Sequence, residues 1–127
     1  MAHILLIEDD DLLRNTLRQM LELDHHRVSE AANGEEGMRR FGSGTGIDLV
    51  LTDVLMPGID GTQVITELRR QQPGLPIIAM SGGRRLLSPE FNLETARLVG
   101  ATAVLAKPFG RSELQAALQT VLQVTLP

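Results

Sequence analysis

Short apolar segments alternate with segments of helical periodicity from one end of this chain to the other. The clearest apolar segments are residues 4–7, 47–52, 75–80 and 103–106, and a weaker one lies at 27–32. Continuous apolar runs of this length are typical of strands that are buried on both faces of a sheet. Between them, apolar residues recur every three or four positions, as at Leu114, Leu118 and Val121, which indicates amphipathic helices. The pattern therefore predicts five strands and five helices.

Strands that alternate with helices form a parallel sheet with right-handed crossovers and helices on both faces. For 127 residues we expect an α/β protein of the flavodoxin-like kind, a doubly wound five-stranded parallel sheet with strand order 2-1-3-4-5. Asp10 or Asp11 is expected to cap the first helix and Asn33 the second. The fourth helix is expected at about 88–100. No internal repeat or linker divides the chain, so we expect residues 1–127 to form a single domain.

Composition excludes several classes of function. Sixteen acidic residues against twelve basic ones leave a net charge of −4, whereas domains that bind nucleic acid directly carry a basic surplus. No apolar run approaches the roughly 20 residues of a membrane helix, and no basic region precedes residues 4–7 as in a secretory signal. The chain has no cysteine, which excludes thiolate chemistry. We therefore expect a cytoplasmic protein without a direct nucleic-acid or membrane partner.

Polar residues that can carry chemistry follow the predicted strands. Glu8 and Asp9 come directly after the first strand, Asp53 after the third, Ser81 after the fourth and Lys107 after the fifth. In an open parallel sheet, ligands bind beyond the carboxyl ends of the strands, at the point where the strand order reverses. We therefore expect these five side chains to lie at one edge of the sheet.

Carboxylates that converge to about 4 Å repel one another by roughly 4 kcal/mol per pair at an effective dielectric constant near 20. A cation relieves this repulsion, and a set of oxygen ligands without His or Cys favours Mg²⁺. A lysine and a hydroxyl beside Mg²⁺ can neutralise and orient a phosphoryl group. Each feature taken alone has a simpler explanation, such as acidic residues at a helix N-terminus or a turn after a strand. Their expected concentration at one edge favours phosphoryl chemistry.

Four motifs stand out at the predicted strand ends: residues 4–10 (ILLIEDD), 48–61 (DLVLTDVLMPGIDG), 81–82 (SG) and 107–109 (KPF). Together they resemble a response regulator receiver domain of two-component signal transduction, and the resemblance extends over residues 3 to about 123. It implies a signalling domain rather than an enzyme, with self-catalysed phosphotransfer and autodephosphorylation. The phosphoryl donor would be a histidine kinase or a histidine phosphotransfer protein. The output would be a downstream protein bound by the fifth strand and the fourth and fifth helices.

The resemblance also assigns a role to each site residue. It implies that Asp53 accepts the phosphoryl group and that Ser81 and Lys107 contact it. The Mg²⁺ ligands would be Asp9, Asp53 and the backbone carbonyl of Leu55, with Glu8 acting through water. The peptide bond between Lys107 and Pro108 would be cis.

Two alternatives remain open at this point. One is a receiver-like scaffold that keeps the fold without being phosphorylated. The other is a Mg²⁺-dependent phosphohydrolase of the aspartyl-phosphate type, which needs a second carboxylate two residues after its nucleophile, where this chain has Leu55. The chain also departs from the family pattern three residues before Lys107, where Val104 replaces the usual aromatic residue.

Overall fold

The computed structural model describes residues 2–43, 46–54, 61–81 and 100–125. Its strands and helices are, in chain order, β1 (His3–Ile7), α1 (Asp11–Leu23), β2 (Arg27–Ala31), α2 (Gly34–Gly42), β3 (Leu49–Asp53), α3 (Gly61–Gln71), β4 (Ile77–Ser81), β5 (Ala103–Ala106) and α5 (Arg111–Thr125). The strands form one parallel sheet in the order β2-β1-β3-β4-β5, which confirms the predicted fold class and topology. The described residues contain four helices, and the helix expected at 88–100 falls almost entirely in 82–99, outside them.

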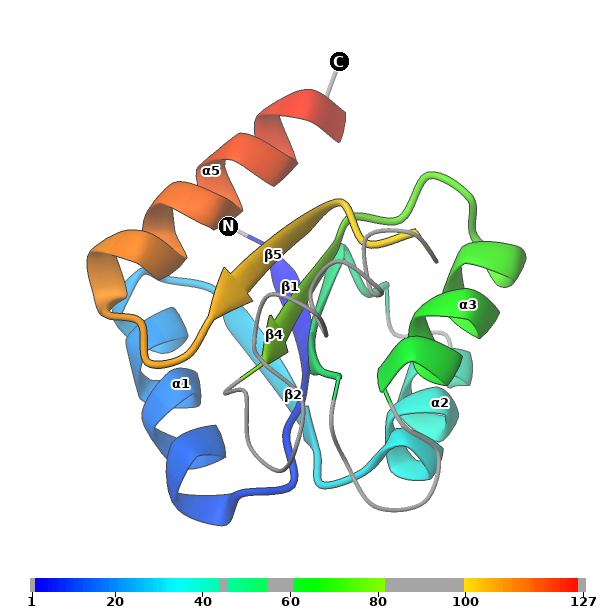
Figure 1. Ribbon diagram of the computed structural model, residues 1–127, viewed down its shortest axis with the longest axis horizontal. Coiled ribbons are helices and arrows are strands. Elements are labelled where there is room, and N and C mark those ends of the chain that lie inside the picture. The colour runs from blue at the N-terminus through cyan, green and yellow to red at the C-terminus, as the bar shows by residue number, and fades with distance from the viewer. Residues whose placement is uncertain (1, 44–45, 55–60, 82–99, 126–127) are drawn as a thin grey trace.

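The helices cover the sheet in two layers, with α1 and α5 on one face and α2 and α3 on the other (Figure 1). Alternate residues of β1 enter opposite layers of the core, because side chains on a strand alternate between its faces. Leu5 and Ile7 pack in the layer that contains Val64 and Leu68 of α3. Ile4 and Leu6 pack in the other layer, with residues of α1 and α5. Each fully buried Leu or Ile contributes about 1.5–3 kcal/mol relative to an exposed one, so both layers stabilise the sheet.

The turn after β1 is held by a helix cap. Asp10 lies just outside α1 in an extended conformation, and its side chain accepts hydrogen bonds from the backbone N–H groups of Leu12 and Leu13 at 3.0 and 3.1 Å. Asn33 caps α2 in the same way through the N–H of Glu36 at 2.8 Å. These caps satisfy N–H groups that have no partner inside the helix. The first cap ends β1 and starts α1 within four residues, which leaves Glu8 and Asp9 at the end of the sheet.

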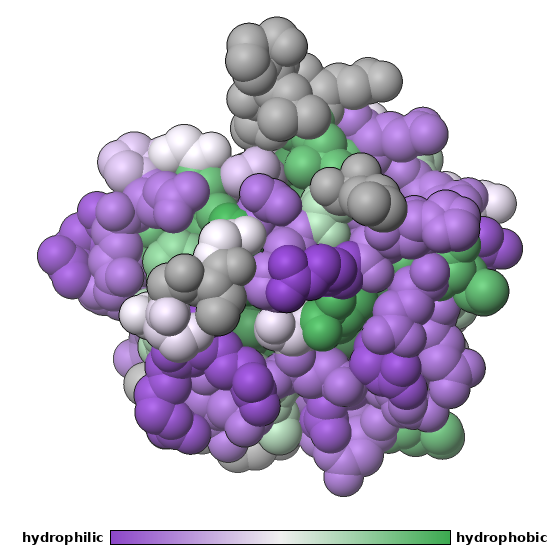
Figure 2. Space-filling view, turned by 180° about the vertical axis from the view of Figure 1, so that it is seen from behind, coloured by the Kyte–Doolittle hydropathy of each residue, from purple (hydrophilic) through white to green (hydrophobic). Residues whose placement is uncertain are grey.

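The surface carries few large apolar side chains. Leu12 and Leu23 of α1 are the large hydrophobic residues that are exposed in the described part of the chain. Seen from behind, the molecule is mostly hydrophilic, and its hydrophobic side chains form small separate patches (Figure 2). None of the helices that the structure describes is both long and apolar enough to span a membrane.

Candidate functional site

The predicted site residues lie at the carboxyl ends of neighbouring strands. Glu8 follows β1 directly, Asp53 and Ser81 are the last residues of β3 and β4, and Lys107 follows β5. The strand register keeps these positions level with one another across the sheet. Asp53 pairs with Met80, the residue before Ser81, and Ser81 pairs with Ala106, the residue before Lys107. Each of these side chains is therefore placed by a strand of the sheet and not by a loop alone, and the strands before Glu8, Asp53 and Ser81 are fully buried.

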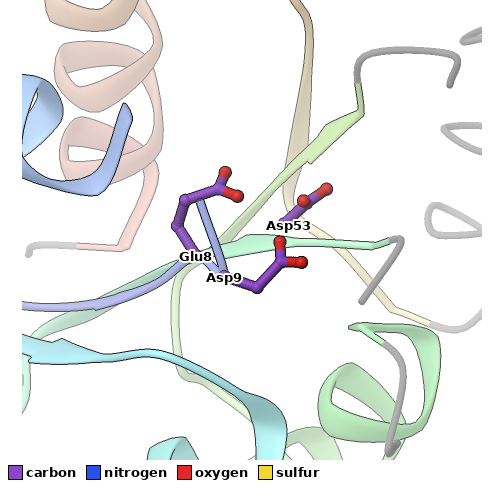
Figure 3. Close-up of side chains that lie close together, drawn as sticks. All are labelled: Glu8, Asp9 and Asp53. Carbon is purple, nitrogen blue, oxygen red and sulfur yellow. The ribbon is translucent and has the colours of Figure 1, made fainter. Parts of the chain in front are cut away.

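Three carboxylates meet at this edge. One carboxylate oxygen from each of Glu8, Asp9 and Asp53 lies within 4.8 Å of the others. Figure 3 shows the Asp9 carboxylate pointing toward Asp53 from the turn after β1. Glu8 is 0% exposed and Asp53 is 1% exposed, so water screens their charges poorly. Such a group of carboxylates strongly favours a bound cation.

Lys107 supplies one positive charge to this group. Its Nζ lies 2.7 Å from Glu8 Oε1 and 3.3 Å from Asp53 Oδ2, and its side chain is only 12% exposed. The pKa of Glu8 is raised to about 7, first by burial and then by the charge of Asp53, while contact with Lys107 partly opposes the increase. With all three carboxylates ionised, one ammonium leaves an excess of negative charge. The residues present therefore suit a divalent cation with oxygen ligands.

Ser81 and Lys107 are joined through the backbone. Ser81 is fully buried, and its carbonyl accepts a hydrogen bond from the Lys107 N–H at 2.8 Å. The Lys107–Pro108 peptide bond is cis, as the resemblance implies. Leu55, whose carbonyl was expected to bind the metal, lies outside the described residues. Val104 is partly buried and packs against the core layer of α3, so an aliphatic side chain occupies the expected aromatic position.

Arg14 belongs to the surroundings of this site, although sequence reasoning did not single it out. Its guanidinium donates a hydrogen bond from Nη1 to the backbone carbonyl of Glu8 at 2.8 Å. A signal was available in the sequence, because Arg14 lies in the first turn of α1, where the helix dipole disfavours a positive charge. A basic residue in that position needs another favourable contact, and the carbonyl of Glu8 provides one.

The arrangement can hold a metal ion and receive an anionic group. The carboxylates supply oxygen ligands, and Lys107 places a positive charge beside Asp53. A buried carboxylate flanked by cations can act as a nucleophile toward an electrophile that carries negative charge, because the cations offset the repulsion between them. A phosphoryl group is an electrophile of this kind.

Comparison with known proteins gives a family match over most of the chain. Residues 4–119 match the family described as "Response regulator receiver domain". The chain is 36% identical over 121 residues to a probable transcriptional regulator, ycf27, of Cyanidium caldarium, a match that covers 95% of this chain and 46% of that protein. It is 37% identical to the transcriptional regulatory protein AfsQ1 of Streptomyces coelicolor, with 97% of this chain and 52% of that protein covered. The chain therefore spans about half the length of these curated relatives.

Solved structures of receiver domains agree with this match over nearly their full length. A response regulator receiver domain protein from Clostridium thermocellum superposes with a TM-score of 0.88 at 29% identity, covering 98% of this chain and 96% of that one. The chemotaxis protein CheY4 of Vibrio cholerae superposes with a TM-score of 0.83, also at 29% identity, covering 95% and 98%. The fold of this chain thus recurs in solved receiver-domain structures.

Proposed function

Because this chain belongs to the response regulator receiver family of two-component systems, we propose that it is a phosphorylation-dependent switch whose phosphoacceptor is Asp53. The donor is a phosphohistidine of a histidine kinase or of a histidine phosphotransfer protein. One observation carries the proposal: the carboxylate of Asp53 is buried at a strand end, next to two other carboxylates and in contact with the Lys107 ammonium. That environment favours transfer of a phosphoryl group to Asp53.

The metal in this proposal is Mg²⁺. Asp9, Asp53 and the backbone carbonyl of Leu55 would hold it directly, and Glu8 would act through water. When bound, Mg²⁺ supplies positive charge that stabilises the phosphoryl oxygens in the transition state. The support from the structure is the donor set itself, three carboxylates whose oxygens lie within 4.8 Å of one another.

The transfer step uses residues of this chain in distinct roles. A carboxylate oxygen of Asp53 attacks the phosphorus in line, and the phosphorus–nitrogen bond of the phosphohistidine breaks as the new phosphorus–oxygen bond forms. The electron pair of the broken bond stays on the leaving imidazole nitrogen. Lys107 moves its ammonium toward the transferred oxygens, and the Ser81 hydroxyl donates a hydrogen bond to one of them. Water later attacks the phosphorus, which releases inorganic phosphate and restores the Asp53 carboxylate.

The phosphoryl group changes which protein the domain binds. We assign the output surface to β5 and α5 together with the helix expected at 88–100. We further propose that residues 1–127 form one receiver unit that acts in the cytoplasm, where kinases draw on ATP. A net charge of −4 favours a protein as its direct partner over a nucleic acid.

Phosphorylation by a small phosphodonor tests the acceptor. The wild-type protein, incubated with acetyl phosphate and Mg²⁺, is expected to gain one phosphoryl group in intact-mass spectrometry, and Asp53→Asn is expected to gain none. The amide keeps the shape of the side chain but is not a nucleophile. Asp48→Asn is the matched control, because Asp48 is exposed and bonds the His3 N–H near the start of β1. Labelling of Asp53→Asn at the wild-type rate would exclude Asp53 as the acceptor, and an unlabelled wild type would favour the scaffold alternative.

A further inference from the structure

We propose that Arg14 is a positioning residue that sets the geometry of the metal-binding carboxylates by holding the peptide group between Glu8 and Asp9. The inference rests on the proposed Mg²⁺ site and adds a residue that does not itself touch the metal or the phosphoryl group. Its basis is the hydrogen bond from Arg14 Nη1 to the Glu8 carbonyl at 2.8 Å.

The Glu8 carbonyl is part of the peptide unit that joins the two acidic residues of the site. A peptide group is planar, so rotating it changes ψ of Glu8 and φ of Asp9 together. The backbone from which both carboxylates project would then adopt a different conformation. The hydrogen bond from Arg14 restricts this rotation, because the carbonyl oxygen has to stay within reach of the guanidinium. Holding one atom thus restricts the backbone that carries two prospective metal-site side chains.

The other polar groups of Glu8 are also held. Its N–H donates to the Ala31 carbonyl at the end of β2 at 3.1 Å, and its Oε2 accepts from the Asp10 N–H at 3.2 Å. Its Oε1 contacts Lys107. Arg14 therefore completes a set of contacts in which the amide, the carbonyl and the carboxylate of Glu8 each have a partner. Of these three groups of Glu8, only the carbonyl would lose its partner if Arg14 were replaced.

The remaining contacts of Arg14 anchor its guanidinium and balance its charge. Nη2 bonds Asp11 Oδ1 at 2.7 Å, and Nε lies 3.5 Å from Glu30 Oε1 on β2. The Asp11 side chain is 86% exposed, and ion pairs of that kind contribute little to stability. The Arg14 side chain is 17% exposed, and its planar group presents several donors in fixed directions. We therefore attribute the positioning role of Arg14 to its hydrogen bond with the Glu8 carbonyl and not to its ion pair with Asp11.

Arg18 provides a matched control on the same helix. Its guanidinium pairs with Glu22 at 2.7 Å and shares Glu30 with Arg14, at 3.5 Å. It lies one turn farther along α1, and within the described residues its hydrogen bonds and ion pairs are with Asn15, Glu22 and Glu30. Replacing Arg14 or Arg18 removes the same charge from the same helix and leaves Glu30 with one arginine. Each variant also loses one ion pair on the helix surface, with Asp11 or with Glu22, and Arg14→Met alone loses the contact with the Glu8 carbonyl.

The test is the Mg²⁺ affinity of Arg14→Met and Arg18→Met, measured by isothermal titration calorimetry. Residues that orient metal ligands typically change affinity by 10–100-fold when replaced, so we expect Arg14→Met to raise the Kd about 10-fold and Arg18→Met to change it less than about 2-fold. Arg14→Lys keeps the charge but offers a single flexible ammonium, and we expect an intermediate Kd. Urea unfolding in EDTA, followed by circular dichroism, serves as a stability readout without metal.

The outcomes separate this inference from the proposed function. Wild-type protein that binds no Mg²⁺ would overturn the proposed metal site itself. Wild type that binds Mg²⁺, with Arg14→Met and Arg14→Lys binding it equally well, would overturn the positioning role alone. If Arg14→Met and Arg18→Met lost Mg²⁺ affinity equally, the loss would come from removing a positive charge from α1. That result would also overturn the positioning role. If Arg14→Met does not fold, the Kd values of Arg14→Lys and Arg18→Lys for Mg²⁺ are compared instead. Equal values would again overturn the positioning role.

Discussion

Lys107 shows how much one side chain can contribute to this site. It is the only lysine in the chain, and its ammonium contacts both Glu8 and Asp53, two carboxylates with almost no exposure to water. Without a metal, Lys107 holds these carboxylates together. In the proposed reaction its charge shifts to the incoming phosphoryl oxygens. The same ammonium can serve both states because a lysine side chain is long and flexible.

Replacing Lys107 by alanine should slow phosphorylation strongly. Removing one charge-stabilising donor from a transition state typically costs about 10²–10³-fold in rate, and we expect the initial rate of labelling by acetyl phosphate to fall by about 10²-fold. Phosphorylation is followed by intact-mass spectrometry at saturating Mg²⁺. Arg70→Ala is the control, since it removes an equal charge from an exposed side chain that pairs with Glu67 on α3. A labelling rate for Lys107→Ala within a few-fold of this control would contradict the assigned role.

At the scale of the elements, close contacts between helices and strands hold the edge of the sheet that carries the site. Gly37 of α2 faces Ile7, the last residue of β1 before Glu8. A Cβ at position 37 would lie 2.5 Å from Ile7 Cδ1 and 2.9 Å from Ile7 Cγ1, closer than side chains tolerate. The absence of a side chain at Gly37 thus lets α2 approach β1 directly behind the site.

Gly37→Val should destabilise the fold. Overpacking of a buried contact costs typically 1–3 kcal/mol, and we expect the free energy of unfolding to fall by about 2 kcal/mol. Gly42→Ala, at the exposed end of the same helix, meets no atom within 4 Å and should change it by less than about 1 kcal/mol. Urea unfolding followed by far-UV circular dichroism measures both, since the chain has no Trp or Tyr for fluorescence. Equal stability of Gly37→Val and wild type would refute the close packing.

A second contact between elements links α1 to α5 and depends on pH. Arg111 Nη2 and Gln115 Nε2 both donate to Asp24 Oδ1, at 2.6 and 2.8 Å. The Arg111 hydrogen bond is the main reason that the pKa of Asp24 lies below its usual value of 3.8. A carboxyl group with a lowered pKa in the folded state stabilises the protein above its unfolded-state pKa, and this contribution is lost as the pH falls toward the folded-state value.

Asp24→Asn should therefore be less stable than wild type at pH 6, and the difference should shrink as the pH falls from about 4 toward 3. Urea unfolding at several pH values gives the two stability curves. Glu67→Gln is a useful comparison, because the pKa of Glu67 is lowered to about 2 mainly by a hydrogen bond from Arg70 on the surface of the same helix, and not by a contact between two helices. A constant difference between wild type and Asp24→Asn across this pH range would show that the charge of Asp24 does not contribute.

At the scale of the whole molecule, repulsion between the carboxylates of the site destabilises the fold that brings them together. Folding gathers three carboxylates at one edge with a single lysine among them. In the unfolded chain these groups are separated and hydrated. A cation that binds the gathered carboxylates therefore binds the folded state preferentially, and binding stabilises it by mass action.

Magnesium should raise the stability of the wild-type protein. At a Mg²⁺ concentration of ten times the Kd, the free energy of unfolding should increase by about 1.4 kcal/mol. Asp9→Ala should show little of this increase at the same concentration, since it removes one of the proposed ligands. Sodium chloride at matched ionic strength controls for general screening of charge. Equal stabilisation by sodium and magnesium would mean that the carboxylates do not form a specific site.

The local structure and the position of the site could be predicted from the sequence. The apolar run of β1, the caps Asp10 and Asn33 and the alternation of strands with helices all depend on residues close together in the chain. General rules for parallel sheets then place Glu8, Asp53, Ser81 and Lys107 at one edge. Strand limits were less accurate: 47–52 and 75–80 were expected, whereas β3 is Leu49–Asp53 and β4 is Ile77–Ser81. The ends of a strand depend on hydrogen bonds to its neighbours, which apolar periodicity does not describe.

The contacts inside the site were decided by the tertiary structure alone. Lys107 and Glu8 are 99 residues apart, and their 2.7 Å contact depends on how the strands and both helix layers pack. The bond from Arg14 to the Glu8 carbonyl depends on the turn that Asp10 caps and on where α1 lies against β2. Sequence patterns report the character of a side chain and its spacing along the chain. Hydrogen bonds require atoms to meet within a few tenths of an ångström, and only the packed fold determines positions that closely.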